Sequence, residues 1–256
     1  MGGGLAIVPF WFLLICFAIL GAIWGSFVAA LCIRWPEGGS IASGRSRCDA
    51  CGRTIAAYDL IPIFSYLFLL GKCRACDQTI GRDAIAIEIA AALAGVVPLV
   101  FLPADQAFAL AVLSWLLLPL IILDHRHLWL PNRLVLLLAV GGILAGPLLT
   151  PEVTALDRLF GAINGYLFLQ SVRLLFFAVR KIEGMGAGDP KLFGALGIWL
   201  GWQALPPVLL LASLIGLAWV LFLFIIHKHT TREIAFGSML ALGALVCIIG
   251  TSLLSV

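Results

Sequence analysis

The sequence predicts an all-α, polytopic membrane protein, and three observations predict this fold class. Of its 256 residues, 62% are hydrophobic and only 11% are charged, whereas about a quarter of the residues in a soluble domain are charged. The mean hydropathy is +1.13. Long apolar runs also recur along the whole chain, and about 20 apolar residues in a row are enough to cross a bilayer as a helix.

Eight apolar runs are separated by polar segments, so we expect about eight transmembrane helices, the sixth of them short. The first run is longer than the apolar core of a signal peptide, and no basic stretch precedes it, so we expect it to remain as a membrane anchor. We divide the chain into residues 1–83, with the first helix and a long polar loop, and residues 84–256, with the other helices. The runs cover residues 5–33, 84–102, 107–123, 134–149, 159–179, 192–205, 208–226 and 234–254.

The basic residues indicate how this bundle is oriented in the membrane. Threading eight spans from the long polar loop places all but two of the 16 lysines and arginines on one side. Because loops rich in lysine and arginine stay in the cytoplasm, we expect that side to be cytoplasmic and both termini to face outward. The exceptions are Arg158, on the far side, and Arg173, within the fifth run. We expect Arg173 to extend toward the interface, with a binding role as the alternative. The net charge of +3 gives no indication of a nucleic-acid partner.

Four of the seven cysteines form two CxxC pairs in the long polar loop. Cys48 and Cys51 lie in CDAC, and Cys73 and Cys76 lie in CRAC. Each pair can hold a metal ion from a tight turn, and four thiolates make a closed tetrahedral site for structural zinc. The alternative is a pair of disulfides, which do not persist in a cytoplasmic loop. We therefore predict that these four cysteines bind zinc.

The insert between the two cysteine pairs, residues 60–70, reads LIPIFSYLFLL. It is too short to span the bilayer, so we expect an interfacial or re-entrant segment. Just after this loop, near the inner end of the second run, lies Glu88. Its carboxylate can pair with a basic group or an amine, or it can form an ion pair with Arg82 or Arg34.

Two aspartates are expected at the same membrane depth. Asp124 ends the third apolar run in ILDHRH, and Asp189 begins the sixth in GMGAGDPK. The glycines before Asp189 permit close approach of a neighbouring helix or of an extended peptide. Pro190 fits the first turn of a helix, so the simplest role for Asp189 is to cap that helix.

A functional role for the two aspartates follows from their expected proximity. Two carboxylates held close together do not both ionise easily, so one keeps its proton while the other is charged. Such a pair can activate water and protonate a departing amine, which is the chemistry of aspartic proteases. Acids in a membrane can also serve an ion or proton pathway, so the pattern alone leaves both interpretations open.

Four motifs, in this order, resemble those of type IV prepilin peptidases. Residues 25–36 read GSFVAALCIRWP, the tandem CxxC pairs follow, and DHRHLWLPN from Asp124 and GMGAGDPK around Asp189 come last. The final motif contains the GxGD signature of that family. The first two are similar to the amino-terminal half of its bifunctional members. The resemblance covers nearly the whole chain.

The resemblance implies that Asp124 and Asp189 are the catalytic pair of a membrane aspartic endopeptidase and that the four cysteines bind zinc. Family members remove the short basic leader from type IV prepilins and pseudopilins, of pilus or type II secretion systems, at the cytoplasmic face of the bacterial inner membrane. Bifunctional members then methylate the new amino terminus with S-adenosylmethionine, and residues 1–83 would be the half associated with this methyltransferase activity. The expected partners are prepilin or pseudopilin substrates and membrane lipid. No residue is assigned to the methyl donor.

Two further interpretations stand beside this one. The first is a family member that cleaves leaders but has lost methyl transfer. The second is a transporter in which Asp124 and Asp189 relay a cation or a proton. A transporter more often places its acids near the middle of the membrane and has internal repeats, and neither feature is seen in the sequence.

Overall fold

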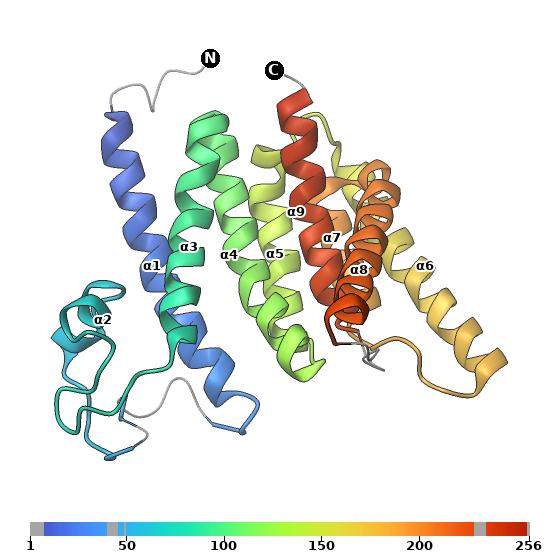
Figure 1. Ribbon diagram of the computed structural model, residues 1–256. Helices are drawn as coiled ribbons and strands as arrows, with labels where there is room; N and C mark the ends of the chain where they lie inside the picture. The colour runs from blue at the N-terminus through green and yellow to red at the C-terminus, as the bar shows by residue number, and fades with distance from the viewer. Residues whose placement is uncertain (1–7, 40–45, 49, 228–233, 255–256) are drawn as a thin grey trace. The chain divides into compact units, whose positions relative to one another are not determined.

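The computed structural model describes residues 8–39, 46–48, 50–227 and 234–254. In these ranges the protein is helical, and the β pairing consists of two isolated antiparallel bridges in the long loop. The all-α prediction is therefore confirmed (Figure 1). The elements are α1 (Phe10–Arg34), η1 (Ala57–Leu60), α2 (Phe64–Phe68), α3 (Arg82–Phe101), α4 (Ala104–His127), α5 (Asn132–Leu149), α6 (Ala155–Arg180), α7 (Asp189–Leu200), η2 (Trp202–Ala204), α8 (Leu205–His227) and α9 (Phe236–Leu254).

The helices match the eight apolar runs, and α2 lies in the insert between the cysteine pairs. Among the described residues, six helical stretches are long and apolar enough to cross a membrane, namely α1, α3, α4, α5, α6 and η2 with α8. The apolar part of α9 is shorter, Phe236–Thr251. The helix α7 has only 12 residues and is about 18 Å long, so it is too short to cross a bilayer alone. The protein is a multi-pass membrane protein with one half-length helix in its bundle.

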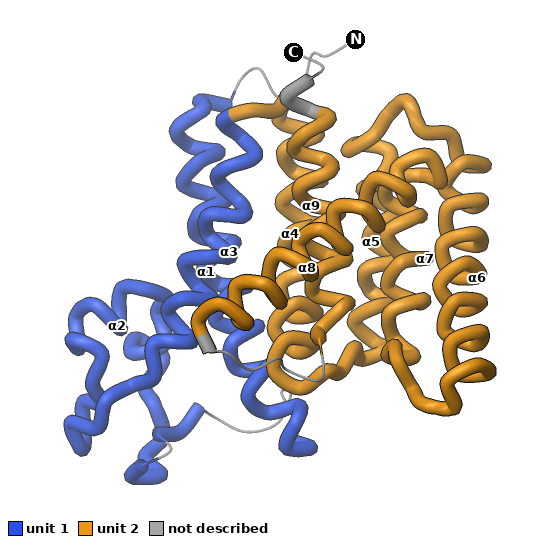
Figure 2. The backbone as a smooth tube through the Cα atoms, turned by 45° about the vertical axis from the view of Figure 1, so that its right-hand side comes forward, with its two compact units in different colours: residues 1–100 blue, residues 101–256 orange. Residues whose placement is uncertain are grey.

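The chain forms two compact units, Met1–Val100 and Phe101–Val256 (Figure 2). The first unit contains α1, the cysteine-containing loop and α3, so the second apolar run packs with the first. Glycines on α1 allow this packing. A Cβ atom on Gly25 would lie 2.6 Å from the Cα atom of Glu88 in α3, so the two backbones approach more closely than side chains at that position would permit.

The second unit is built around the short helix α7. This helix packs against α5, α6 and α9, and it buries almost all of its residues, including Trp199. Its contact with α6 is backbone against backbone, because a Cβ atom on Gly161 would lie 2.5 Å from the carbonyl oxygen of Gly197. On its other side, Trp199 Nε1 donates a hydrogen bond to the carbonyl oxygen of Leu138 in α5, at 2.8 Å. These contacts hold α7 in a defined position, and α7 carries Asp189 at its first residue.

Arg158, in the first turn of α6, is buried against the carboxyl-terminal ends of α5 and α7. The last carbonyl groups of a helix have no partner within it and carry partial negative charge. One guanidinium therefore satisfies two helix ends, which explains why a basic residue is retained away from the other basic residues. Its acceptors are the carbonyl oxygens of Ile198 (3.0 Å), Trp199 (2.6 Å), Gly146 (3.0 Å) and Thr150 (2.7 Å).

Replacing Arg158 by methionine should destabilise the second unit, because buried carbonyl groups at two helix ends lose their donor. Hydrogen bonds to a charged group contribute about 1.5–3 kcal/mol each, so we expect a loss of about 3 kcal/mol or more in the free energy of unfolding. Arg158→Lys keeps the charge but lacks the planar guanidinium that reaches both helices. Its stability should therefore lie between that of the wild type and that of the methionine variant. Thermal unfolding in detergent measures this order, and equal Tm values for all three proteins would contradict it.

Candidate active site and cysteine lobe

The structure brings Asp124 and Asp189 together at one end of the second unit. Asp124 lies in the last turn of α4 and Asp189 is the first residue of α7, and each is only 4% exposed. The two carboxylates are close enough to interact electrostatically. The capping role considered for Asp189 is wrong, because the residue at the cap position is Gly188 and no side chain caps this helix. Asp189 is therefore a buried acid whose side chain is not used by its own helix end.

The amino-terminal end of α9 forms a third side of this site. A Cβ atom on Gly237 would lie 3.0 Å from Oδ2 of Asp124 and 3.0 Å from Oδ1 of Asp189. Both carboxylates therefore face the same small space beside this glycine. Because even one methyl group would touch both acids, the absence of a side chain at Gly237 keeps that space open.

Ser238 gives Asp124 two possible donors. Its backbone N–H donates to Oδ2 of Asp124 at 2.6 Å. Its hydroxyl lies 3.0 Å from the same oxygen and 3.1 Å from the carbonyl oxygen of Ile121, and its single hydrogen can go to either. Sequence reasoning did not single out Gly237 or Ser238. The available signal was that the last apolar run begins at the same predicted membrane face as the two aspartates.

The loop before Asp189 is held by a residue from α6. Nε of Arg173 donates to the carbonyl oxygen of Met185 at 3.3 Å, and its guanidinium lies 3.8 Å from the carboxylate of Glu183. Arg173 therefore contacts the loop that precedes Asp189, and its extension toward the membrane interface and a role in ligand binding stay predictions. Nearby, Nζ of Lys191 donates to Oδ1 of Asn132 at 2.8 Å, which links the first turns of α7 and α5.

The four predicted zinc ligands also come together. Residues 46–48 and 50–81, which we call the cysteine lobe, place the sulfur atoms of Cys48, Cys51, Cys73 and Cys76 within 4.8 Å of one another. The sulfur atoms of Cys48 and Cys76 are 3.8 Å apart. Zinc–sulfur bonds of about 2.3 Å in a tetrahedron separate the sulfur atoms by about 3.8 Å, so the four thiols can hold zinc after side-chain shifts of about 1 Å or less. All seven cysteines are free thiols, so the disulfide alternative is wrong.

Each CxxC pair lies in a similar turn. The N–H of Cys48 bonds to the carbonyl of Arg53, and the N–H of Cys73 bonds to the carbonyl of Gln78. In the second turn, backbone hydrogen bonds from Ala75 and Cys76 lower the pKa of the Cys73 thiol to about 7. At Cys76, a hydrogen bond from the Gln78 backbone is outweighed by burial and by the other three thiols of the cluster, which raise the pKa of the Cys76 thiol to about 12. Thiolate is the form that binds zinc, so Cys73 is the member of this pair that is closer to the metal-binding form near neutral pH.

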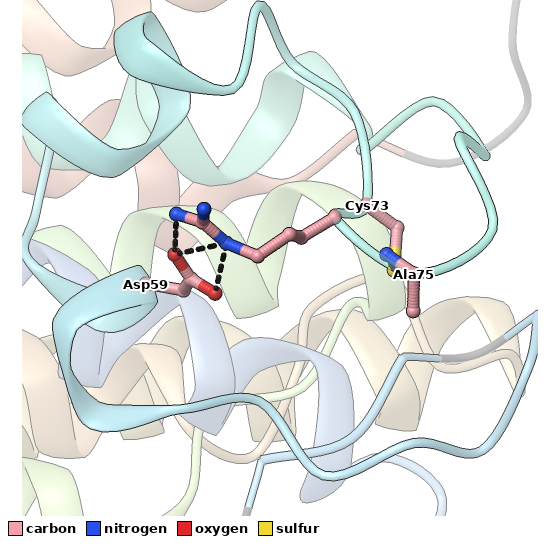
Figure 3. Close-up of polar contacts among 4 residues, drawn as sticks. Asp59, Cys73 and Ala75 are labelled. Atoms are coloured by element: carbon pink, nitrogen blue, oxygen red, sulfur yellow. Dashed lines mark hydrogen bonds and ion pairs between the residues drawn. The ribbon is translucent and has the colours of Figure 1, made fainter.

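An ion pair connects the second cysteine turn to η1 (Figure 3). The guanidinium of Arg74 donates to both oxygens of Asp59, with the shortest contact at 2.7 Å, and it lies 5.4 Å from the ring centre of Tyr58. The Arg74 side chain is 59% exposed, so the pair contributes little to stability. Its two-pronged geometry instead orients the turn relative to η1.

Glu88 joins the cysteine lobe to α3. Its carboxylate accepts the backbone N–H of Ile63 at 2.7 Å, so its partner is a peptide group rather than Arg82 or Arg34. Ile63 has φ 64°, which is unusual for a β-branched residue, and this hydrogen bond helps to hold that conformation. After it, α2 exposes large apolar side chains, as expected of an interfacial segment. These are Phe64, Leu67 and Phe68, followed by Leu70.

Two buried carboxylates that face the same space in an apolar helical bundle fit a membrane-bound aspartic peptidase. The family model described as "Type IV leader peptidase family" matches residues 111–221, which carry Asp124 and Asp189. A second model, "Bacterial Peptidase A24 N-terminal domain", matches residues 19–101. The chain belongs to the type IV leader peptidase family, which confirms the resemblance seen in the motifs.

Curated relatives agree with this assignment. A protein of Aeromonas salmonicida (strain A449) named prepilin leader peptidase/N-methyltransferase is 40% identical over 207 residues, which are 80% of this chain and 71% of the relative. One of Pseudomonas aeruginosa with the same name is 41% identical over 207 residues, again 80% and 71% of the two chains. One of Burkholderia pseudomallei (strain K96243) is 41% identical over 175 residues, 68% of this chain and 56% of the relative. No solved structure matches the chain.

Proposed function

We propose that this protein removes the basic leader from prepilins or pseudopilins and then methylates the new amino terminus. The observation that carries the proposal is the convergence of Asp124 and Asp189 beside Gly237. The names of the relatives supply the substrate class and the second activity. We place the reaction at the cytoplasmic face of the bacterial inner membrane, because basic residues lie close in sequence to both acids. Arg126 is in the last turn of α4 with Asp124, Lys191 is in the first turn of α7 with Asp189, and Arg133 is in the first turn of α5.

Cleavage follows from two carboxylates in unequal surroundings. One aspartate removes a proton from water, and the oxygen of that water bonds to the scissile carbonyl carbon. The partner aspartic acid donates a hydrogen bond to the carbonyl oxygen. As the carbon–nitrogen bond breaks, the departing amine receives the proton that the first aspartate took from water and becomes the new amino terminus.

The hydrogen bonds of Ser238 support a division of roles. Donors to a carboxylate stabilise its charged form, and Ser238 places its N–H and its hydroxyl beside one oxygen of Asp124. Asp124 is therefore suited to be the base and Asp189 the acid. The glycines before Asp189 leave room for an extended peptide. A Cβ atom on Gly186 would already lie 3.4 Å from the Asp189 carboxylate.

The four cysteines would hold zinc in a structural site. When bound there, zinc supplies a crosslink between the two cysteine turns and keeps no open position for a substrate. The cleavage step therefore relies on the aspartates and uses no metal. Methyl transfer requires S-adenosylmethionine as donor.

Cleavage in ¹⁸O-labelled water tests the proposal. The purified protein is mixed in detergent with a prepilin whose leader is basic, and the products are weighed by mass spectrometry. We expect one cut before the hydrophobic segment and one ¹⁸O atom in the carboxyl terminus of the leader, because water is the nucleophile. With S-adenosylmethionine, the mature product should gain one methyl group. Ion transport by reconstituted protein together with an intact prepilin would reject the proposal in favour of a transporter.

A further inference from the structure

Arg173 faces the protein from a part of α6 whose other side chains face outward. Among the last ten residues of this helix, 171–180, Arg173 is partly buried and the other nine are exposed. It continues a stripe of buried residues at every fourth position, which are Gly161, Gly165 and Leu169. An ionisable side chain that faces the interior of a membrane bundle is a candidate for a functional role. The two aspartates alone leave Arg173 without one.

The guanidinium of Arg173 holds the loop that leads to Asp189. Its Nε donates a hydrogen bond to the carbonyl oxygen of Met185 at 3.3 Å, and Nη2 lies 3.8 Å from the carboxylate of Glu183. It is also close enough to Asp189 to interact electrostatically. The side chain of Glu183 is 76% exposed, so this ion pair is open to water and weak. The hydrogen bond to the backbone is therefore the contact that can fix the loop.

This hydrogen bond reaches Asp189 through a single peptide group. The carbonyl of Met185 and the N–H of Gly186 are opposite edges of one planar peptide unit. The backbone of Gly186 interacts with the carboxylate of Asp189, and a Cβ atom on Gly186 would lie 3.4 Å from Oδ2 of that carboxylate. Arg173 therefore holds one edge of the peptide unit whose other edge meets the proposed acid.

The composition of the loop explains why such a contact is needed. Residues 183–188 read EGMGAG, and a glycine loses more conformational freedom than other residues when it is fixed in one conformation. No side chain caps the start of α7. The two ends of the loop are packed, Gly184 against the ring of Phe176 and Gly188 against Leu130. The hydrogen bond from Arg173 adds a polar contact to the middle of the loop.

We propose that Arg173 is a positioning residue for leader cleavage, which holds the peptide unit between Met185 and Gly186 and thereby keeps the carboxylate of Asp189 in place beside Asp124. The inference rests on the proposed peptidase function and adds to it a residue beyond the two acids. In this role Arg173 does not touch the substrate. It acts on the chemical step, because a displacement of about 1 Å at a reacting group can lower the rate about 100-fold.

Steady-state cleavage of a prepilin by the wild type, Arg173→Gln and Arg173→Lys tests this role. Arg180→Gln is the matched control, because it removes an exposed arginine from the same helix. In Arg173→Gln, kcat should fall about tenfold to 100-fold, with KM within about twofold of the wild-type value. Arg173→Lys should recover part of the lost kcat, because an ammonium group keeps a charged donor beside the loop. Arg180→Gln should cleave like the wild type.

Hydrogen–deuterium exchange of residues 183–188, measured by mass spectrometry on the same samples, reports on the loop itself. Deuterium uptake there should increase in Arg173→Gln, increase less in Arg173→Lys and stay unchanged in Arg180→Gln. The Tm of each variant in detergent shows whether the rest of the bundle is folded.

Two results would overturn the inference. The first is a wild-type kcat in an Arg173 variant whose loop takes up more deuterium, and Arg173→Lys provides this comparison if Arg173→Gln does not fold. The second is a raised KM with an unchanged kcat, which would make Arg173 a substrate-binding residue. Absence of cleavage by the wild type would instead count against the proposed function.

Discussion

Asp124→Asn and Asp189→Asn are each expected to abolish leader cleavage while leaving the helical bundle folded. Asparagine has the shape of aspartate, and its oxygen can still accept the Ser238 N–H, but it neither takes a proton from water nor donates a carboxylic proton. General acid and base groups contribute about 100-fold to 10,000-fold each. We therefore expect kcat/KM to fall by at least about 100-fold in either single variant.

A control from the same helix makes this result specific. Asp105→Asn changes an exposed acid in the first turn of α4 and should cleave like the wild type. Circular dichroism and Tm in detergent confirm folding of all three variants. If either Asp124→Asn or Asp189→Asn retains wild-type kcat/KM, the two residues are not a catalytic pair.

Gly237→Ala is expected to lower leader cleavage about 100-fold or more, because displacements of about 1 Å at a reacting centre can have effects of this size. The added methyl group would lie 3.0 Å from an oxygen of each aspartate and 2.7 Å from Cδ1 of Leu130. It would therefore enter the space in which water and the scissile carbonyl must meet.

The Tm of Gly237→Ala distinguishes a variant whose reaction site is blocked from one whose helix α9 is destabilised. Alanine is favoured over glycine in a helix by about 1 kcal/mol, so propensity alone predicts no loss of Tm. Gly250→Ala is the matched control in the same helix α9, since a Cβ atom there meets nothing within 4 Å. It should keep full activity. Equal cleavage by Gly237→Ala and Gly250→Ala would show that Gly237 does not bound the reaction site.

The cysteine turns show how local spacing could predict part of the site. Two CxxC pairs form two similar turns because each pair is contiguous, and their sulfur atoms meet at distances that fit zinc. Zinc itself remains a prediction. The insert between the turns was expected to be interfacial, and α2 exposes Phe64 and Phe68, although their contact with lipid is still to be tested.

Other contacts could not be predicted, because they join elements far apart in the sequence. The partner of Glu88 is a peptide N–H whose position depends on the fold of the lobe. Arg158 was seen only as an exception to the charge pattern, since the carbonyl groups that it binds come from two other helices. The division between the units likewise follows from close packing of α3 on α1, which composition along the chain does not report.

The membrane class, the positions of the apolar helices, the two cysteine pairs and the common depth of Asp124 and Asp189 could all be predicted from the sequence. Hydropathy, residue spacing and charge depend on the order of residues in the chain, so these features can be predicted without knowing which distant segments are in contact. The short sixth helix was also predicted, but its almost complete burial, and the place of Gly237 and Ser238 of α9 beside the two acids, became evident only in the folded structure. Whether two carboxylates face the same space depends on how closely three helices pack, and that closeness comes from glycine contacts between segments distant in sequence.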